Sequence, residues 1–137
     1  LLDFARSARF MGIPYRHPTR FPLATQNAAR AYYWLHGKDC ALARQFAHAV
    51  FRALYVDDRD IAAPDVVLEI AAGLGVDRNS LQAALQTPEI KARLKDEVDG
   101  ALKIGVFGSP HVIIDGEAFF GADRLPQIEK WLETGGF

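Results

Sequence analysis

The chain has 137 residues and a formal net charge of −1; half of its residues are hydrophobic and 24% are charged. This length suits one domain with a real core, and the balanced charge argues against nucleic acid or an anionic membrane surface as partner. No apolar run approaches the roughly 18 residues of a membrane span, and no signal-peptide pattern opens the chain. A single cysteine, Cys40, excludes an internal disulfide and a CxxC motif within these residues, so a reducing, cytoplasmic setting is predicted.

The spacing of apolar residues predicts that roughly the first hundred residues are helical. The first helix, over 1–11, has no capping residue ahead of it, which leads us to expect a further N-terminal piece before Leu1. The segment 13–22 carries three prolines and three basic residues, and it is predicted to be an extended loop. Thr25 is then predicted to cap a helix that ends at Gly37.

A longer helix is expected from about Asp39 to Tyr55. Phe46, Val50 and Leu54 should form its buried stripe, with Phe51 beside them. The polar connection "VDDRD" follows, and after it the pattern predicts three shorter helices, over 64–75, 79–86 and 88–103.

Towards the C-terminus the spacing of apolar residues changes from that of a helix to that of a strand. Two apolar runs, 111–114 and 117–120, flank Asp115-Gly116, which is a strong signal for a β-hairpin. A lone hairpin is marginally stable in water, and the first run is apolar on both faces, as in a strand buried within a sheet. We therefore expect partner strands from residues outside this sequence or from another chain.

Two positions near this hairpin are candidates for binding chemistry. Pro110 would leave backbone groups facing a cleft if its peptide bond were cis, although the local sequence alone favours an ordinary trans proline. Asp123 would begin a last helix over 123–133. Its carboxylate could hold an ammonium group of a ligand, but alone it favours a simple N-cap.

Other polar residues give weaker signals. His17 lies in the basic loop, which either attracts an anionic substrate or is a solvated surface, and His111 would lie at the mouth of the cleft beside Pro110. Cys40 near a helix start could have a lowered pKa, but the favoured interpretation is a buried, inert thiol. No histidine pair has metal-ligand spacing, and no serine has a recognisable general base nearby.

The stretch "GVFGSPHVIIDGEAFFGADRL" (105–125) resembles the C-terminal end of a thioredoxin-fold protein with a helical insertion. The resemblance is strongest to the 2-hydroxychromene-2-carboxylate isomerases and the related kappa-class glutathione transferases. "RALYVDDRDIAAPDVV" (52–67) resembles the helical insert of these proteins, and "ATQNAAR" (24–30) resembles a segment lining their substrate cavity. The similarity extends over essentially the whole chain.

The resemblance implies an α/β, thioredoxin-like fold with a large all-helical insertion, whose first βαβ unit is absent from this sequence. Residues 1–104 would be the helical insertion domain, and residues 105–137 the C-terminal ββα part of the thioredoxin-like domain. In this family the first unit carries the catalytic serine, whose hydroxyl holds the glutathione sulfur as a thiolate. The catalytic residue is therefore expected upstream of Leu1.

The resemblance also implies a glutathione site without a metal. Ser109, ahead of a cis Pro110, would pair its backbone with the cysteinyl amide of glutathione, and Asp123 would take the γ-glutamyl ammonium group. Thr25 would contact the substrate. The implied glutathione-binding residues are Ser109, Pro110, Phe120, Gly121, Ala122 and Asp123.

The implied activity is that of a cytoplasmic, glutathione-dependent isomerase in aromatic compound catabolism. It would act on 2-hydroxychromene-2-carboxylate-like aromatic carboxylates by reversible thiolate addition. A homodimer is one possible assembly. Ser109, Ala122 and Ala24 depart from the residues usual in the family, and Ala24 puts the substrate in question. Two alternatives remain: a Dsb-type thiol–disulfide oxidoreductase with its CxxC upstream of Leu1, and a non-enzymatic helical binding module.

Overall fold

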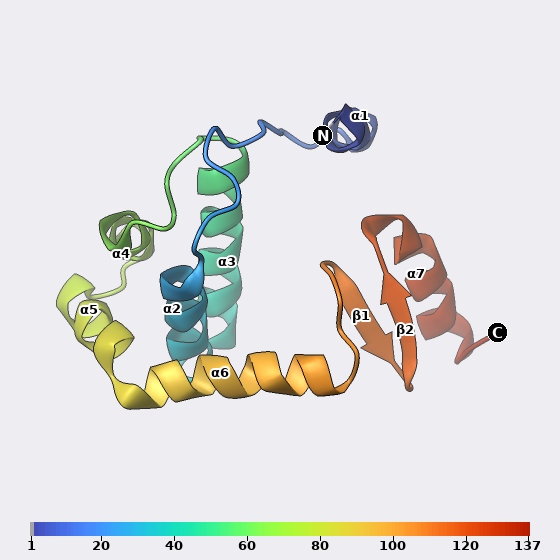
Figure 1. The fold of residues 1–137 in the computed structure, drawn as a ribbon. Coiled ribbons are helices and arrows are strands. Elements are labelled where there is room, and N and C mark those ends of the chain that lie inside the picture. The colour runs from blue at the N-terminus through green and yellow to red at the C-terminus, as the bar shows by residue number, and fades with distance from the viewer. Residues whose placement is uncertain (1) are drawn as a thin grey trace. The chain divides into compact units, whose positions relative to one another are not determined.

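The structure, a computed structural model, describes residues 2–137. Its elements in chain order are α1 (Leu2–Met11), α2 (Gln26–His36), α3 (Cys40–Tyr55), α4 (Pro64–Ala72), α5 (Arg78–Gln86), α6 (Pro88–Lys103), β1 (His111–Ile114), β2 (Glu117–Phe120), the 3₁₀ turn η1 (Ala122–Arg124) and α7 (Leu125–Thr134) (Figure 1). The predicted helices and the hairpin are all present. No helix in the described part of the chain is long and apolar enough to cross a bilayer.

The packing divides the chain into two compact units, one ending at Asp96 and the other beginning at Glu97. This division falls inside α6. The predicted domains, 1–104 and 105–137, follow from the family resemblance, and they stay a prediction.

Unit 1 is built around α2 and α3, which lie side by side, with α4 and α5 packed next to them (Figure 1). Phe46, Val50 and Leu54 of α3 are buried, as their spacing predicts. Phe51 is 62% exposed and does not belong to the core, because five residues turn the helix about 140° away from Phe46. The core residues are Ala28, Ala31, Leu35, Ala43, Phe46, Val50, Ala53, Leu54, Ile61, Val67, Leu68, Ile70, Ala71, Leu81 and Leu85.

The two predicted helix starts in this region behave differently. Asp39 caps α3 with its side chain, which accepts hydrogen bonds from the backbone N–H groups of Ala41 and Leu42 at 2.8 and 3.1 Å. Thr25 precedes α2 but its hydroxyl makes no cap bond, so the predicted side-chain cap is wrong. The reason is its backbone, which at φ −103° and ψ 8° lies outside the extended conformation of a capping residue.

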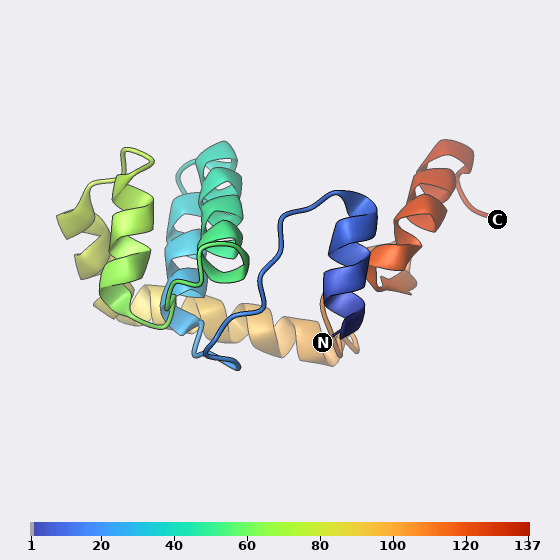
Figure 2. The ribbon, with the colours of Figure 1, turned by 90° about the horizontal axis from the view of Figure 1, so that it is seen from above.

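The first helix and the loop that follows it lead into this unit. Figure 2 shows α1 standing apart from the other helices of unit 1, joined to α2 by the extended segment. That segment, 13–22, forms no helix or strand, as its prolines predict, and the peptide bond between Phe21 and Pro22 is cis.

Unit 2 contains the hairpin and α7. Asp115 and Gly116 have φ angles of +52° and +87°, and these left-handed conformations form the tight turn between the antiparallel strands. Trp131 of α7 donates a hydrogen bond from Nε1 to Oδ2 of Asp115 at 3.0 Å, and its ring packs edge-on against Phe119 at 5.7 Å. These contacts attach α7 to one face of the hairpin.

The opposite face of the hairpin is more open. Strand alternation places Ile113 and Phe120 on the face away from Phe119, and both are exposed. The sheet has two strands among the residues that the structure describes. The partner strands expected from the apolar pattern of β1 stay a prediction.

Candidate functional site

The open end of the hairpin brings the two halves of the predicted glutathione site together. His111 and Phe120 are paired across the strands, and the carbonyl oxygen of Pro110 accepts a hydrogen bond from the Gly121 N–H at 3.1 Å. The peptide bond between Ser109 and Pro110 is cis, as the resemblance implied and against what the local sequence favoured. The stretch that contains Ser109 and Pro110 therefore lies beside the stretch that begins at Phe120.

Ser109 offers its backbone to a partner. The residue is exposed, and its backbone N–H and C=O make no hydrogen bond to any residue of the described chain. Unpaired main-chain groups at the edge of a hairpin can pair with an extended peptide as another strand would.

An aromatic cluster supports this edge. The ring of Phe120 lies 4.7 Å from that of Phe107, centroid to centroid, and Phe107 packs edge-on against His111 at 5.2 Å. Gly108 allows this packing because a Cβ atom at that position would overlap the Phe120 ring. His111 thus lies in the cluster, and its Nδ1 atom is buried with no hydrogen-bond partner among the described residues.

Asp123 is not the N-cap of the last helix, and that prediction is wrong. It lies in the middle of the 3₁₀ turn η1, and α7 begins two residues later, at Leu125. The chain folds into this turn because Gly121, at φ +107°, accepts the Arg124 N–H at 3.1 Å.

The carboxylate of Asp123 is consequently available to a ligand. Its side chain is 75% exposed, and the guanidinium of the neighbouring Arg124 lies 3.8 Å away. A side chain at Gly121 would overlap this carboxylate, so glycine there allows Asp123 to lie against the backbone at the end of β2. Ala122, between them, presents no polar side-chain atom.

Thr25, the predicted substrate contact, belongs to unit 1. Its carbonyl oxygen accepts the Ala29 N–H at 3.0 Å, while the side chain is exposed and caps nothing. Six of the predicted site residues therefore cluster in unit 2, and Thr25 presents an exposed hydroxyl in unit 1.

Cys40 is exposed, so the expectation of a buried thiol is wrong. It is the first residue of α3, and a helix end lies at the protein surface rather than in the core. Its Sγ atom is 3.7 Å from Nε2 of His36, one turn away at the end of α2.

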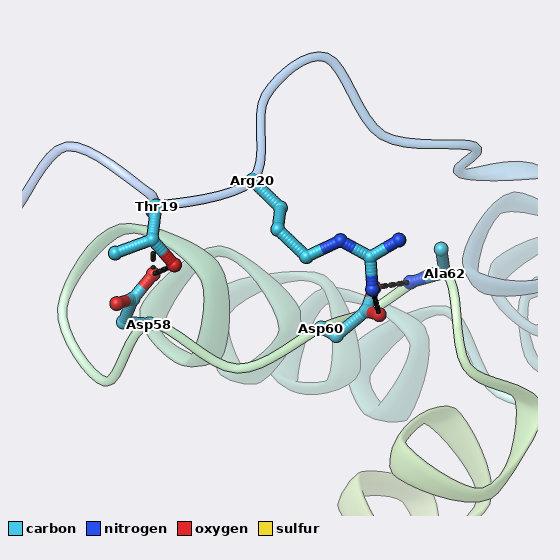
Figure 3. Close-up of polar contacts among 5 residues, drawn as sticks. All are labelled: Thr19, Arg20, Asp58, Asp60 and Ala62. Atoms are coloured by element: carbon cyan, nitrogen blue, oxygen red, sulfur yellow. Dashed lines mark hydrogen bonds and ion pairs between the residues drawn. The ribbon is translucent and has the colours of Figure 1, made fainter.

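A polar tie between the extended loop and the α3–α4 connection is absent from the sequence-based predictions. Oδ1 of Asp58 accepts hydrogen bonds from the Thr19 backbone N–H at 2.8 Å and from its hydroxyl at 3.2 Å (Figure 3). Arg16 pairs with the other oxygen of Asp58 at 2.9 Å.

A second ion pair reinforces this tie. Arg20 pairs with Asp60, whose other oxygen accepts the Ala62 N–H at 3.1 Å (Figure 3). Arg16 and Arg20 thus hold the loop in place and are not simply a solvated surface. The signal that could have revealed the tie is the match between a basic loop and the acidic segment "VDDRD".

The hydrogen bond from the Thr19 backbone N–H is the main reason that the pKa of Asp58 lies below its usual value of 3.8. Burial opposes this shift, and the Thr19 hydroxyl and the Arg16 charge add smaller lowering effects. A lowered folded-state pKa means that the charged form contributes stability at higher pH. That contribution is complete above the unfolded-state pKa and is lost as the pH falls through the folded-state value.

We expect Asp58→Asn to be less stable than the wild type at neutral pH, with the difference shrinking as the pH falls below about 4. Asparagine tolerates the left-handed backbone of this residue, at φ +57°, so the substitution mainly removes the charge. The measurement is chemical unfolding from pH 7 to pH 3. Thr19→Val, which keeps the backbone donor and removes the hydroxyl, should fall between the two; parallel pH curves for Asp58→Asn and wild type would contradict this role.

Comparison with known proteins identifies the class. The sequence matches the DSBA-like thioredoxin domain family over residues 1–133, and the chain belongs to this family. The thioredoxin-like fold implied by the resemblance is thereby confirmed.

Two characterised relatives are a kappa-class glutathione transferase and an isomerase. The chain is 30% identical over 142 residues to glutathione S-transferase kappa 2 of Caenorhabditis elegans, covering 95% of this chain and 63% of that protein. It is 27% identical over 135 residues to 2-hydroxychromene-2-carboxylate isomerase of Sphingobium xenophagum, covering 96% of this chain and 66% of that protein. The chain thus spans slightly less than two thirds of the length of either relative.

Solved structures agree on the fold. A 2-hydroxychromene-2-carboxylate isomerase superimposes with a TM-score of 0.86 at 23% identity, covering 96% of this chain and 63% of that structure. The cytosolic disulfide reductase DsbM from Pseudomonas aeruginosa, solved with GSH, superimposes with a TM-score of 0.70 at 24% identity, covering 96% of this chain and 72% of that structure.

Proposed function

We propose that this chain is part of a cytoplasmic glutathione-dependent isomerase that acts on 2-hydroxychromene-2-carboxylate-like aromatic carboxylates. The observation that carries the proposal is the open end of the hairpin, where Ser109 and Pro110 lie beside the segment that leads to Asp123. The identities to a kappa-class transferase and to an isomerase support it.

The residues at this end fit a glutathione molecule by their chemistry. Glutathione is an extended tripeptide, and the unpaired backbone of Ser109 offers the donor and acceptor that its cysteinyl amide needs. The exposed carboxylate of Asp123 is a suitable partner for the γ-glutamyl ammonium group. The chain's own residues therefore bind and orient the tripeptide at both ends of its γ-glutamyl-cysteinyl part.

When bound, glutathione supplies a thiolate that adds reversibly to a conjugated double bond of the substrate and leaves unchanged after rotation about that bond. The serine that would hold this thiolate is proposed to lie upstream of Leu1. Phe120 and Gly121 would shape the γ-glutamyl end of the site. The side chain of Ala122 has no hydrogen-bond donor, so the backbone and Asp123 would hold that end of the ligand.

The exposed hydroxyl of Thr25 is our candidate for contact with the aromatic carboxylate. It is available because it caps nothing. Ala24 beside it departs from the residue usual in the isomerases, and this departure concerns which aromatic carboxylate is the substrate. A homodimer is the assembly that we would look for first.

A second candidate is a Dsb-type thiol–disulfide oxidoreductase, which the match to the DSBA-like family and the likeness to DsbM support. The residues upstream of Leu1 discriminate between the two. A serine near the end of the first strand supports the isomerase, and a CxxC motif supports the oxidoreductase. A non-enzymatic helical module would have neither.

The direct test is titration of the purified protein with reduced glutathione by isothermal calorimetry, followed by an isomerase assay with 2-hydroxychromene-2-carboxylate. We expect saturable binding and turnover that depends on glutathione without consuming it. Undetectable binding at millimolar glutathione would remove the cofactor from the proposal. Binding accompanied by disulfide reduction, without isomerisation, would favour the oxidoreductase.

A further inference from the structure

The short turn between α2 and α3 brings a histidine and the single cysteine of the sequence close together in unit 1 (Figure 1). His36 is the last residue of α2, and Cys40 is the first residue of α3. The residues from 36 to 41 are all exposed, so both side chains are accessible from solvent. The proposed function uses neither of them.

We propose that Cys40 and His36 bind a zinc ion. Thiolate sulfur and imidazole nitrogen are ligands that zinc prefers in proteins. Both residues belong to unit 1, so the proposal goes beyond the glutathione site and does not depend on it.

The separation of the two ligand atoms fits a tetrahedral ion. Sγ of Cys40 lies 3.7 Å from Nε2 of His36. With Zn–S and Zn–N bonds of about 2.3 and 2.0–2.1 Å, a tetrahedral angle at the metal places the two ligand atoms about 3.6 Å apart. A zinc ion can therefore bond to both atoms with little movement of either side chain.

The main chain offers a third donor atom. The carbonyl oxygen of His36 lies 3.6 Å from Sγ of Cys40, and no backbone N–H of the described residues donates to it. A Zn–O bond of about 2.0–2.2 Å at the same angle again requires a sulfur–oxygen separation of about 3.6 Å. The sulfur thus has a nitrogen and an oxygen at the separations that one tetrahedral ion needs.

The turn holds these atoms in place before a metal binds. The backbone N–H groups of Lys38 and Asp39 both donate to the carbonyl oxygen of Leu35, at 2.9 and 2.8 Å. The ring of His36 packs against that of Tyr32, with 5.7 Å between the centroids. Asp39 also caps α3, as described above, so the helix end that carries Cys40 is fixed.

The proposed site has two protein side chains and no more. No group of three histidine, cysteine, aspartate or glutamate side chains in the described part of the chain is arranged to hold a metal ion. The remaining tetrahedral position would be taken by water. On binding, the Cys40 thiol releases its proton to solvent as the Zn–S bond forms, and nothing is oxidised or reduced.

The test is titration of the purified, reduced protein with Co²⁺ as a spectroscopic probe, followed by displacement with Zn²⁺. We expect a near-ultraviolet band from thiolate-to-cobalt charge transfer and the strong visible bands of tetrahedral cobalt. Added Zn²⁺ should remove both. Calorimetry with Zn²⁺ alone then measures the affinity for a single ion.

Cys40→Ser and His36→Gln should each weaken Zn²⁺ binding about tenfold or more, because loss of a mere outer-shell partner already costs that much at a metal site. Cys40→Ser should also abolish the charge-transfer band. His48→Gln, which removes an exposed imidazole elsewhere on α3, is the matched control and should change neither result. Circular dichroism checks that each variant keeps its helix content.

Absence of the charge-transfer band at millimolar Co²⁺ would overturn the proposal. So would wild-type Zn²⁺ affinity in either Cys40→Ser or His36→Gln, or an equal loss of affinity in His48→Gln. The metal titrations contain no glutathione, so failure of the zinc site and failure of the proposed function are separate results.

Discussion

Replacing Phe46 by alanine is expected to lower the free energy of unfolding by about 3–5 kcal/mol. Phe46 is 1% exposed and is among the largest fully buried side chains of unit 1. Its removal leaves a cavity between α3 and the helices packed on it, which the surrounding aliphatic side chains cannot fill without moving. Guanidinium unfolding followed by far-ultraviolet circular dichroism measures the loss.

Phe51→Ala is the matched control because it makes the same chemical change on the same helix. Phe51 is largely exposed, so we expect a loss below about 1 kcal/mol. Equal losses for the two variants would show that α3 does not present its Phe46 stripe to the core.

Asp123→Ala is expected to weaken glutathione binding by about tenfold or more, which is the usual effect of removing a hydrogen bond to a charged group. The carboxylate neither caps a helix nor supports the core, so the variant should fold like the wild type. Calorimetry with reduced glutathione measures the affinity, and thermal unfolding confirms the fold.

Two further variants sharpen this test. Asp123→Asn keeps the size of the side chain and removes the charge, so it should bind glutathione nearly as weakly as Asp123→Ala. Glu117→Ala removes an exposed carboxylate at the turn end of the same hairpin, opposite Ile114, and should leave the affinity unchanged. Wild-type affinity in Asp123→Ala would show that this carboxylate does not hold the ammonium group.

Local signals in the sequence predict most of the fold. The spacing of apolar residues and the Asp115-Gly116 turn each act within a few residues, and the helices and the hairpin are found where these signals place them. The segments proposed to bind glutathione are also local, because the hairpin brings positions 110 and 121 together.

Sequence patterns do not predict the features that depend on contacts between distant residues. Thr19 and Asp58 are 39 positions apart, and no periodicity connects them. The hydrogen bond from the Arg16 N–H to the Tyr55 carbonyl oxygen likewise joins the loop to the end of α3. The wrong caps at Thr25 and Asp123 have a different cause: residue type favours a cap, but the backbone around each residue takes another conformation.

The short hairpin in unit 2 determines which mutations can alter the spacing of the proposed glutathione-binding residues. All the proposed glutathione-binding residues lie between positions 109 and 123, so their spacing is set by one turn and four residue pairs. Substitutions, insertions or deletions in the helices of unit 1 leave that spacing untouched. Mutation can therefore reshape the helical unit, and any ligand preference it carries, without rebuilding the proposed tripeptide site.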